Sequence, residues 1–371
     1  MKHKYRNQSL IFFAAVILLV SIQACKPKPS ALENYNRTTL LTNLADSVIA
    51  PAYNNLSSNA ALLNNAANAF AAAPTTLNLQ ALQTAWSNAL DSWMSCEMFN
   101  LGYAETNSLD VQIGAVPANY DLIETEIHGT NTLDESYIAA TGTTRKGFAA
   151  IEYLIYGDGI TQQAVLDSFT TSTAATRRLQ YLQAICAHIK TQASAVSSEW
   201  NNGPGYNNFI SQTQLDISGS LNLLVNALTE HIELVRKAKV GKPLGIDNGG
   251  TTDGSLCEYR LAPRSIQNIR TNILAWKDIY TGKSGIGADD YLDHVGAQYN
   301  GQPLSNTISQ QLDVCLEKAN AINAPLHSAV TVQQAEVNAL YLELKKLTVL
   351  VKVDLASNLG VIITFSDNDG D

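Results

Sequence analysis

The stretch ALQTAWSNALDSWM, residues 81–94, indicates which class of fold this chain adopts. Its large apolar side chains recur at steps of three and four residues: Leu82, Trp86, Leu90, Trp93 and Met94. An α-helix turns once in about 3.6 residues, so these steps place the side chains along one helix face. The stretch is therefore predicted to be a helix whose apolar face is buried against other elements.

The same spacing dominates the rest of the chain. A second apolar stripe consists of Leu40, Leu41, Leu44, Val48 and Ile49. Pro51 is expected to kink or divide this helix before the Ala- and Asn-rich stretch 55–70. Further helices are predicted at 119–128, 145–156, 173–201, 206–239, 263–280, 304–323 and 331–356. The β-branched run 361–365 predicts a short strand before the acidic C-terminal tail. The predicted fold class is all-α.

Glycine and asparagine interrupt the helical pattern near the middle of the chain. They cluster at 201–205 and again at 241–254, and such punctuation marks turns and linkers. We place a domain boundary after residue 202. Residues 35–202 and 203–371 each hold enough helices for an up-and-down bundle. The predicted architecture is two consecutive helical bundles, similar to four-helix bundles, and sites are common in the cleft between such bundles.

The composition excludes one class of partner. The chain has 371 residues, with 24 Lys and Arg against 33 Asp and Glu, which gives a formal net charge of −9. A nucleic-acid-binding face needs basic residues that neutralise phosphates. We therefore expect no nucleic-acid partner. Hydrophobic residues make up 46% of the chain, enough to bury a sizeable core.

The first 24 residues are predicted to be a signal peptide and not part of the fold. Lys2, Lys4 and Arg6 form a basic region. An apolar run at 10–20 follows, which is too short for an ordinary membrane span.

The end of this segment resembles a bacterial lipobox. Residues 22–25 read IQAC, and cleavage before Cys25 would free that cysteine for lipidation. Residues 25–34, which include two prolines, would then form a tether. The mature chain is expected in the cell envelope, anchored by lipid at the outer membrane and facing the periplasm or the cell surface. The alternative is an ordinary secretory signal with an incidental cysteine.

Four cysteines remain beyond the lipidation site: Cys96, Cys186, Cys257 and Cys315. Four cysteines allow three disulfide pairings, and the sequence does not choose among them. No CxxC motif occurs, which disfavours a structural zinc site. Isolated buried thiols are the default expectation at this low density.

Several catalytic motifs are absent from the sequence. No G-x-S-x-G elbow and no H-E-x-x-H helix occurs, so neither a serine hydrolase nor a zincin is supported. The triplet 282–284 resembles the end of a phosphate loop, but Lys277 stands where that loop needs its first glycine. Glu124 and His128 are four residues apart, and a solvated hydrogen bond accounts for that spacing better than a cation site.

Two acidic residues stand in apolar surroundings. Glu152 lies in GFAAIEYLIYG, residues 147–157, and Glu97 lies in WMSCEMF, residues 93–99. A buried carboxylate must be paired, hydrogen-bonded, metal-bound or protonated. Two interpretations follow. Glu97 and Glu152 form a metal or polar-ligand site, or each makes its own buried hydrogen bond or ion pair.

The run GFAAIEYL, residues 147–154, is similar to the GxHxxE region of the imelysin family. These are bacterial envelope proteins implicated in iron uptake and once classed as insulin-cleaving metallopeptidases. Other segments resemble the family in the same order: 46–53, 85–97, 231–236, 239–245, 279–282 and 367–371. The resemblance implies two consecutive α-helical bundles with a site in the cleft between them. It implies that this cleft is lined by Glu97, Asn119, Glu152 and His231, with Glu97 and Glu152 as candidate ligands of iron or another divalent cation.

The sequence departs from the family's motif at Ala149, which stands where the motif has its histidine, although Glu152 is retained. Asn119 stands where the family often has an acidic residue. Both changes remove donors or charge from a metal site. A hydrolytic site would also need an activated water, for which we identify neither ligands nor base. We therefore assign no catalytic residue.

The predicted function is a membrane-anchored, non-catalytic binding protein that serves the uptake of iron or another metal. Its predicted partners are the membrane, through the lipid anchor, and a metal ion, a chelate or an uptake protein of the envelope. The acidic chain would attract cations rather than anions. One alternative is a metal-dependent peptidase that uses Glu152. The other is a structural envelope or adhesion component.

Overall fold

The computed structural model describes residues 31–246, 249–283 and 285–364. The chain up to Tyr35 and the chain from Asn36 onward are separate compact units. In the first unit, the described part holds the one-turn helix α2 (Ala31–Asn34) within the predicted tether. The predicted signal peptide, Cys25 and the acidic tail lie outside the described residues. No helix in the described part of the chain combines the length and apolar character that a membrane crossing requires.

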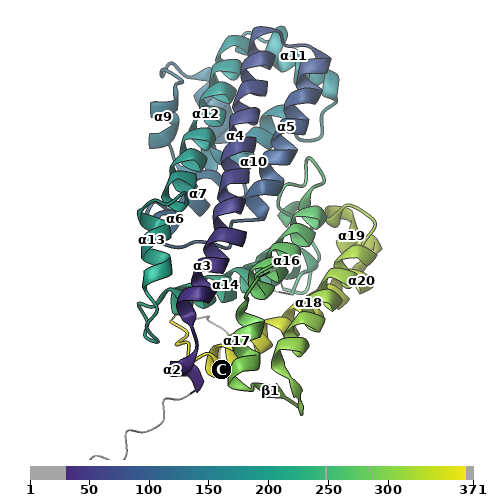
Figure 1. Cartoon of the computed structure of the whole chain (residues 1–371). Helices are drawn as coiled ribbons and strands as arrows, with labels where there is room; N and C mark the ends of the chain where they lie inside the picture. Colours follow the sequence, from purple (N-terminus) through teal and green to yellow (C-terminus); the bar gives the residue numbers. More distant parts are fainter. Residues whose placement is uncertain (1–30, 247–248, 284, 365–371) are drawn as a thin grey trace, which may run out of the picture. The chain divides into compact units, whose positions relative to one another are not determined.

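The unit from Asn36 onward is built almost entirely from helices (Figure 1). Its first half contains α3 (Arg37–Leu44), η1 (Ala45–Ile49), α4 (Ala50–Ala72), α5 (Thr76–Met94), α6 (Tyr103–Thr106), α7 (Leu109–Ile113), α8 (Tyr120–His128), α9 (Glu135–Ala140), η2 (Thr143–Arg145), α10 (Gly147–Tyr156), α11 (Gln162–Thr170) and α12 (Ala175–Trp200). Its second half contains α13 (Pro204–Ser211), α14 (Ser220–Leu234), η3 (Val235–Gly241), α15 (Lys242–Leu244), η4 (Gly254–Leu256), α16 (Ser265–Thr281), α17 (Ala288–Val295), β1 (Gln298–Tyr299), β2 (Gln302–Pro303), α18 (Leu304–Ala321), α19 (Leu326–Val332), α20 (Gln334–Val349), η5 (Leu350–Leu355) and α21 (Ala356–Asn358).

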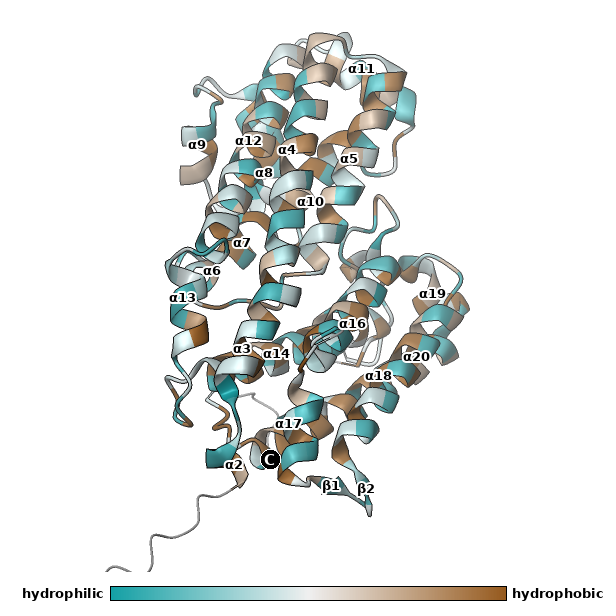
Figure 2. Cartoon of the chain, viewed as in Figure 1, coloured by the Kyte–Doolittle hydropathy of each residue, from teal (hydrophilic) through white to brown (hydrophobic). Residues whose placement is uncertain are grey.

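The first bundle forms around α4, which packs against both α5 and α12. The stripe predicted from residues 81–94 is buried in this core, and Leu82, Trp86 and Leu90 are fully inaccessible to solvent. Helix α10 closes the bundle against α5 and α12, and the Trp86 indole donates to the Phe148 carbonyl at 3.0 Å. Helix α5 carries both hydrophobic and hydrophilic residues (Figure 2), and most of those it buries recur at three- and four-residue steps, which confirms its predicted amphipathic character.

The second bundle forms around α18, which packs against α16 and α20. Helix α14 continues without interruption into the π-helical turn η3, because Leu234 and Val235 both keep right-handed helical dihedral angles. Helix α16 also contacts α5 of the first bundle. At that junction Asn272 of α16 donates to the Met94 carbonyl at the end of α5, at 2.7 Å. The all-α prediction with two bundles is therefore confirmed.

The expected division at Pro51 takes the form of a π-helical turn. Residues Ala45–Ile49 form η1, and Pro51 then occupies the first turn of α4, where a proline is tolerated. The chain stays helical across this junction.

The single helix predicted at 206–239 is instead two helices, α13 and α14. Between them Asp216 accepts hydrogen bonds from the backbone N–H and the hydroxyl of Ser218. Such local side-chain bonds compete with helical bonding. Helix α13 packs against α12, with the rings of Trp200 and Phe209 5.3 Å apart.

The C-terminal segment differs from the prediction because its described residues, 361–364, form no strand. Asparagine side chains of α14 bind its backbone instead: Asn222 accepts from the N–H of Ile362, and Asn226 accepts from the N–H of Thr364. A two-stranded hairpin occurs elsewhere, where β1 pairs with β2 around Asn300 and Gly301. Both turn residues have positive φ, as this tight turn requires.

Candidate functional site

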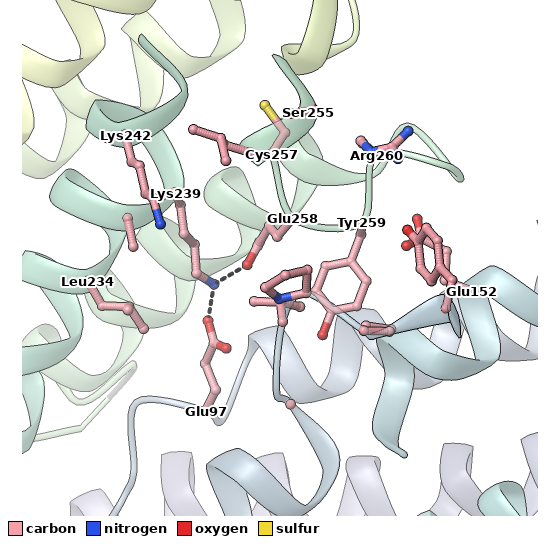
Figure 3. A pocket seen from close by; sticks show the side chains of 18 residues that line it. Glu97, Glu152, Leu234, Lys239, Lys242, Ser255, Cys257, Glu258, Tyr259 and Arg260 are labelled. Atoms are coloured by element: carbon pink, nitrogen blue, oxygen red, sulfur yellow. Dashed lines mark hydrogen bonds and ion pairs between the residues drawn. The ribbon is translucent and has the colours of Figure 1, made fainter. Parts of the chain in front are cut away.

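A cavity of about 420 Å³ lies where the two halves meet (Figure 3). The residues that line it and carry polar or aromatic side chains include Glu97, Tyr120, Glu152, Lys239, Lys242, Glu258, Tyr259 and Arg260. The first three come from the first half and the others from the second. Glu97 and Glu152, which the sequence singled out, therefore line the same cavity.

Local backbone structure places the main charged groups. Glu97 lies in the turn that ends α5, and its N–H donates to the Trp93 carbonyl at 2.8 Å. Lys239 lies in η3. A π-helical turn shifts the helical register, which is why such turns are frequent at functional sites.

The carboxylate of Glu97 is surrounded by donors. Its Oε1 lies 2.5 Å from Lys239 Nζ, 2.8 Å from Asn272 Nδ2 and 3.1 Å from His231 Nε2. Burial by itself would raise the pKa of Glu97, but the Lys239 ammonium and His231 outweigh it and lower the pKa to about 2. Glu97 is therefore an anion that the protein already neutralises.

Lys239 also forms an ion pair with a second carboxylate, that of Glu258. Its Nζ lies 3.4 Å from Glu258 Oε2, and Asn268 donates to Glu258 Oε1 at 3.2 Å. The three charged side chains are nearly inaccessible to solvent, at 5% for Lys239, 7% for Glu258 and 11% for Glu97. Two carboxylates share one ammonium, so one negative charge is in excess. Burial raises the pKa of Glu258, which relieves that excess.

Glu152 is in a different environment. It is 3% exposed, and its Oε1 accepts from the backbone N–H of Ala262 at 2.9 Å. Burial raises its pKa to about 8, although the backbone hydrogen bonds and Arg260 oppose the shift. Glu152 therefore holds a proton at neutral pH.

Tyr259 lies between these acidic groups in the view of Figure 3. Burial first, and then Glu258, Glu97 and Glu152, raise its pKa well above the ordinary value. Its ring packs near Trp86, with centroids 6.1 Å apart. The phenol therefore stays protonated and can donate a hydrogen bond.

The other residues predicted for the cleft have different places. His231 contacts Glu97 but is not among the residues that line the cavity. Burial lowers its pKa, so its imidazole is neutral near pH 7. Ala149 lines the cavity. Asn119 lies outside this cavity, because its side chain caps α8 by accepting from the N–H of Leu122 at 3.0 Å.

Sequence reasoning missed most residues of this site. They are Tyr120, Lys239, Lys242, Glu258, Tyr259 and Arg260 of the cavity lining, and Asn268 and Asn272, which bind its carboxylates. Lys239 opens the K-x-G-x-P-L-G segment at 239–245, but its role became apparent only from the fold. Asn268 and Asn272 are four residues apart on α16 and face the two carboxylates. A buried amide pair at helical spacing is the signal that could have indicated a polar site.

A resident metal ion needs several carboxylate, imidazole or thiolate donors that converge on one point. Among the described residues, no group of three His, Cys, Asp or Glu side chains is arranged to hold one. The side chain of Ala149 has no donor atom, and the carboxylate of Glu97 is already paired with the Lys239 ammonium. An ammonium and a metal ion would compete for the same carboxylate oxygens, so the donor set does not fit a bare cation in this arrangement.

The four cysteines of the described chain are free and buried. Cys257 lines the cavity, and burial raises its pKa to about 12. Its thiol is thus not activated as a nucleophile.

Comparison with known proteins relates this fold to one family. The sequence model of imelysin, peptidase family M75, matches residues 49–351. The chain is 24% identical over 317 residues to iron-regulated protein A of Synechococcus elongatus, which covers 81% of this chain and 82% of that protein.

Solved structures are also similar to this chain. An imelysin-like protein from Psychrobacter arcticum 273-4 superimposes with a TM-score of 0.69 at 20% identity, covering 89% of this chain and 97% of the other. A second structure, from Parabacteroides distasonis ATCC 8503, has a TM-score of 0.69 at 18% identity, with coverage of 91% and 97%. The helical fold and the match over most of its length together show that this chain belongs to the imelysin family.

Proposed function

We propose that this protein is a non-catalytic binding protein of the bacterial envelope that takes part in acquiring iron or another metal. The observation that carries the proposal is the Glu97–Lys239–Glu258 cluster in the wall of the cavity. A polar cavity of about 420 Å³ between two bundles suits a small ligand. The relative in Synechococcus elongatus is named an iron-regulated protein, which supports the link to iron.

The state of the carboxylates in the cavity wall argues against turnover. A catalytic base must reach its substrate in a reactive state, but Glu97 is neutralised by Lys239, and Glu152 accepts hydrogen bonds from backbone N–H groups. We therefore propose that the cavity holds a ligand or chelate without cleaving it.

Membrane anchoring through Cys25 is part of the proposal. The lipobox-like residues 22–25 support it, and lipidation would keep the protein at the outer membrane. Metabolic labelling with a fatty-acid analogue should mark the wild-type protein and not the Cys25→Ser variant. Equal labelling of both would rule out this anchor.

Growth of a deletion strain tests the physiological role. Under limiting iron, the strain should grow more slowly than its parent, and the wild-type gene should restore growth. Haem and copper supply are varied in parallel to identify the metal. Growth that is unaffected by all three supplies would overturn the proposal.

A peptidase assay tests the alternative enzyme. Purified protein should leave an unfolded polypeptide intact during long incubation with zinc or iron. Chelator-sensitive cleavage that disappears in Glu152→Gln would show the opposite, because the amide can neither carry a negative charge nor act as a proton acceptor.

A further inference from the structure

Tyr259 has an unusual environment for a buried phenol. It is 3% exposed, and among the described residues its hydroxyl has no hydrogen-bond partner. Leaving a buried hydroxyl unpaired is destabilising, because the group gives up its hydrogen bonds to water without a replacement. Its backbone φ is +45°, a conformation that is strained for a bulky residue. The Tyr259 side chain is thus kept at the cavity wall although both features are unfavourable. This points to a ligand that accepts a hydrogen bond from its hydroxyl.

Lys242 supplies a second unused donor. It follows Lys239 by three residues, is exposed, and lines the same cavity. Its backbone carbonyl accepts from the Gly245 N–H at 3.1 Å, but within the described parts of the chain its side chain makes no hydrogen bond or ion pair. The neighbouring cations are occupied, since Lys239 binds two carboxylates and Arg260 binds Asp158 at 2.8 and 3.1 Å.

The acceptors of the cavity wall are already engaged. Glu97 accepts from Lys239 and Asn272, and Glu258 accepts from Lys239 and Asn268. The donors left for an incoming molecule are therefore the Lys242 ammonium and the Tyr259 hydroxyl, together with the protonated carboxyl of Glu152. A ligand that satisfies them must be rich in acceptors and negatively charged on the side that meets Lys242.

We propose that the cavity binds a small organic anion with several carboxylate groups, free or as a metal chelate, through the Lys242 ammonium and the Tyr259 hydroxyl. This proposal rests on the proposed binding function and names its ligand class. The residues of the cavity do not fit a bare metal ion. A metal ion would therefore enter only as a chelate, bound to the carboxylates of the organic anion.

Isothermal titration calorimetry of the purified protein tests this ligand class, with citrate and ferric citrate as probes and spermidine as a cationic comparison. Citrate should bind the wild type. Lys242→Gln should weaken binding by about tenfold or more, since a charged hydrogen bond is lost. Tyr259→Phe should weaken it about three- to tenfold. Lys242→Arg should retain most of the affinity.

Lys190→Gln is the matched control. Lys190 is exposed on α12 outside the cavity, so its loss changes the net charge equally and should leave citrate binding unchanged. Circular dichroism checks that each variant folds. Because Lys242 is exposed, its variants should fold and remain informative even if Tyr259→Phe is unstable. Tighter binding of ferric citrate than of citrate would identify the chelate as the ligand, and tighter binding of citrate would identify the free anion.

Two results would overturn the proposal. One is the absence of binding of either citrate probe to the wild type, whether or not spermidine binds. The other is citrate binding that Lys242→Gln leaves unchanged. Failure here is distinct from failure of the proposed function, because the deletion strain can still require the protein for growth on limiting iron.

Discussion

Lys239 Nζ lies 2.5 Å from Glu97 Oε1, although the two residues are 142 positions apart in the sequence. Glu97 follows the last helical turn of α5, and Lys239 lies in η3, so this ion pair joins the two bundles at the cavity. Removing one partner of a buried pair leaves the other charge uncompensated, which is far more costly than losing a surface pair.

Lys239→Met should therefore be strongly destabilising. We expect the free energy of unfolding to fall by about 3–5 kcal/mol, because Glu97 and Glu258 lose their shared cation. Urea denaturation followed by circular dichroism measures the change. The control is Lys346→Met, whose side chain is 62% exposed and whose partner Glu343 is three residues away, so its loss should cost about 1 kcal/mol or less. Equal effects of the two variants would contradict the role of Lys239.

Glu152→Gln should change how stability depends on pH. The pKa of Glu152 is raised from 4.5 to about 8, so the folded state binds more protons than the unfolded state between these values. Stability contributed by this group is present below pH 4.5 and is lost as the pH rises towards 8. The neutral glutamine avoids that loss. Because one pKa unit corresponds to about 1.36 kcal/mol, the variant should exceed the wild type by more than ~1 kcal/mol at pH 9.

Denaturation curves at pH 5 and pH 9 test this prediction. The two proteins should be close in stability at pH 5 and should diverge at pH 9. A constant difference at both pH values would mean that Glu152 does not titrate in this range.

Ala149→His should create a divalent cation site. Ala149 and Glu152 are three residues apart on α10 and both line the cavity, so an imidazole would lie beside the carboxylate. Zinc at a hundred times its dissociation constant should stabilise the variant by about 2.7 kcal/mol. Thermal melts with and without zinc measure this effect.

The control for this prediction is Ala149→His/Glu152→Ala, which should lose the zinc effect. If the imidazole overpacks the wall instead, the variant should lose about 1–3 kcal/mol with no recovery in zinc. That outcome would show that the missing histidine is not the only obstacle to a metal site here.

Thiol counting should find four free cysteines in the Cys25→Ser chain. Each of the four is buried, and burial raises the pKa of Cys257 and Cys315 to about 12, so an aromatic disulfide reagent should react slowly with the native protein. All four should react at once in denaturant without reductant. Fewer than four would reveal a disulfide.

Much of the fold could be predicted from the sequence because helical spacing is a local property. The helix predicted at 119–128 is observed as Tyr120–His128, and the stripe at 81–94 is buried as predicted. The break at 212–219 was missed because it depends on hydrogen bonds between Asp216 and Ser218, which no apolar pattern reveals. The strand predicted at 361–365 was wrong over its described residues because asparagines of α14 bind that backbone.

The candidate site could be predicted only in part. Apolar surroundings identified Glu97 and Glu152 as buried, and the structure places both at one cavity. The partner of Glu97 could not be found this way, since Lys239 reaches it only after two bundles pack together. Tyr259 was missed because it lies in a segment without periodicity, where the spacing of residues does not indicate which way each side chain points.

A crystal structure of the protein soaked in citrate tests the central claim most directly, because it locates the bound molecule. The account predicts density in the cavity, with carboxylate oxygens roughly 3 Å from Lys242 Nζ and Tyr259 Oη and with the Glu97–Lys239 pair intact. Density that lies elsewhere, such as in the separate cavity beside Trp200 and Phe209, would contradict it. So would citrate that displaces Lys239 from Glu97.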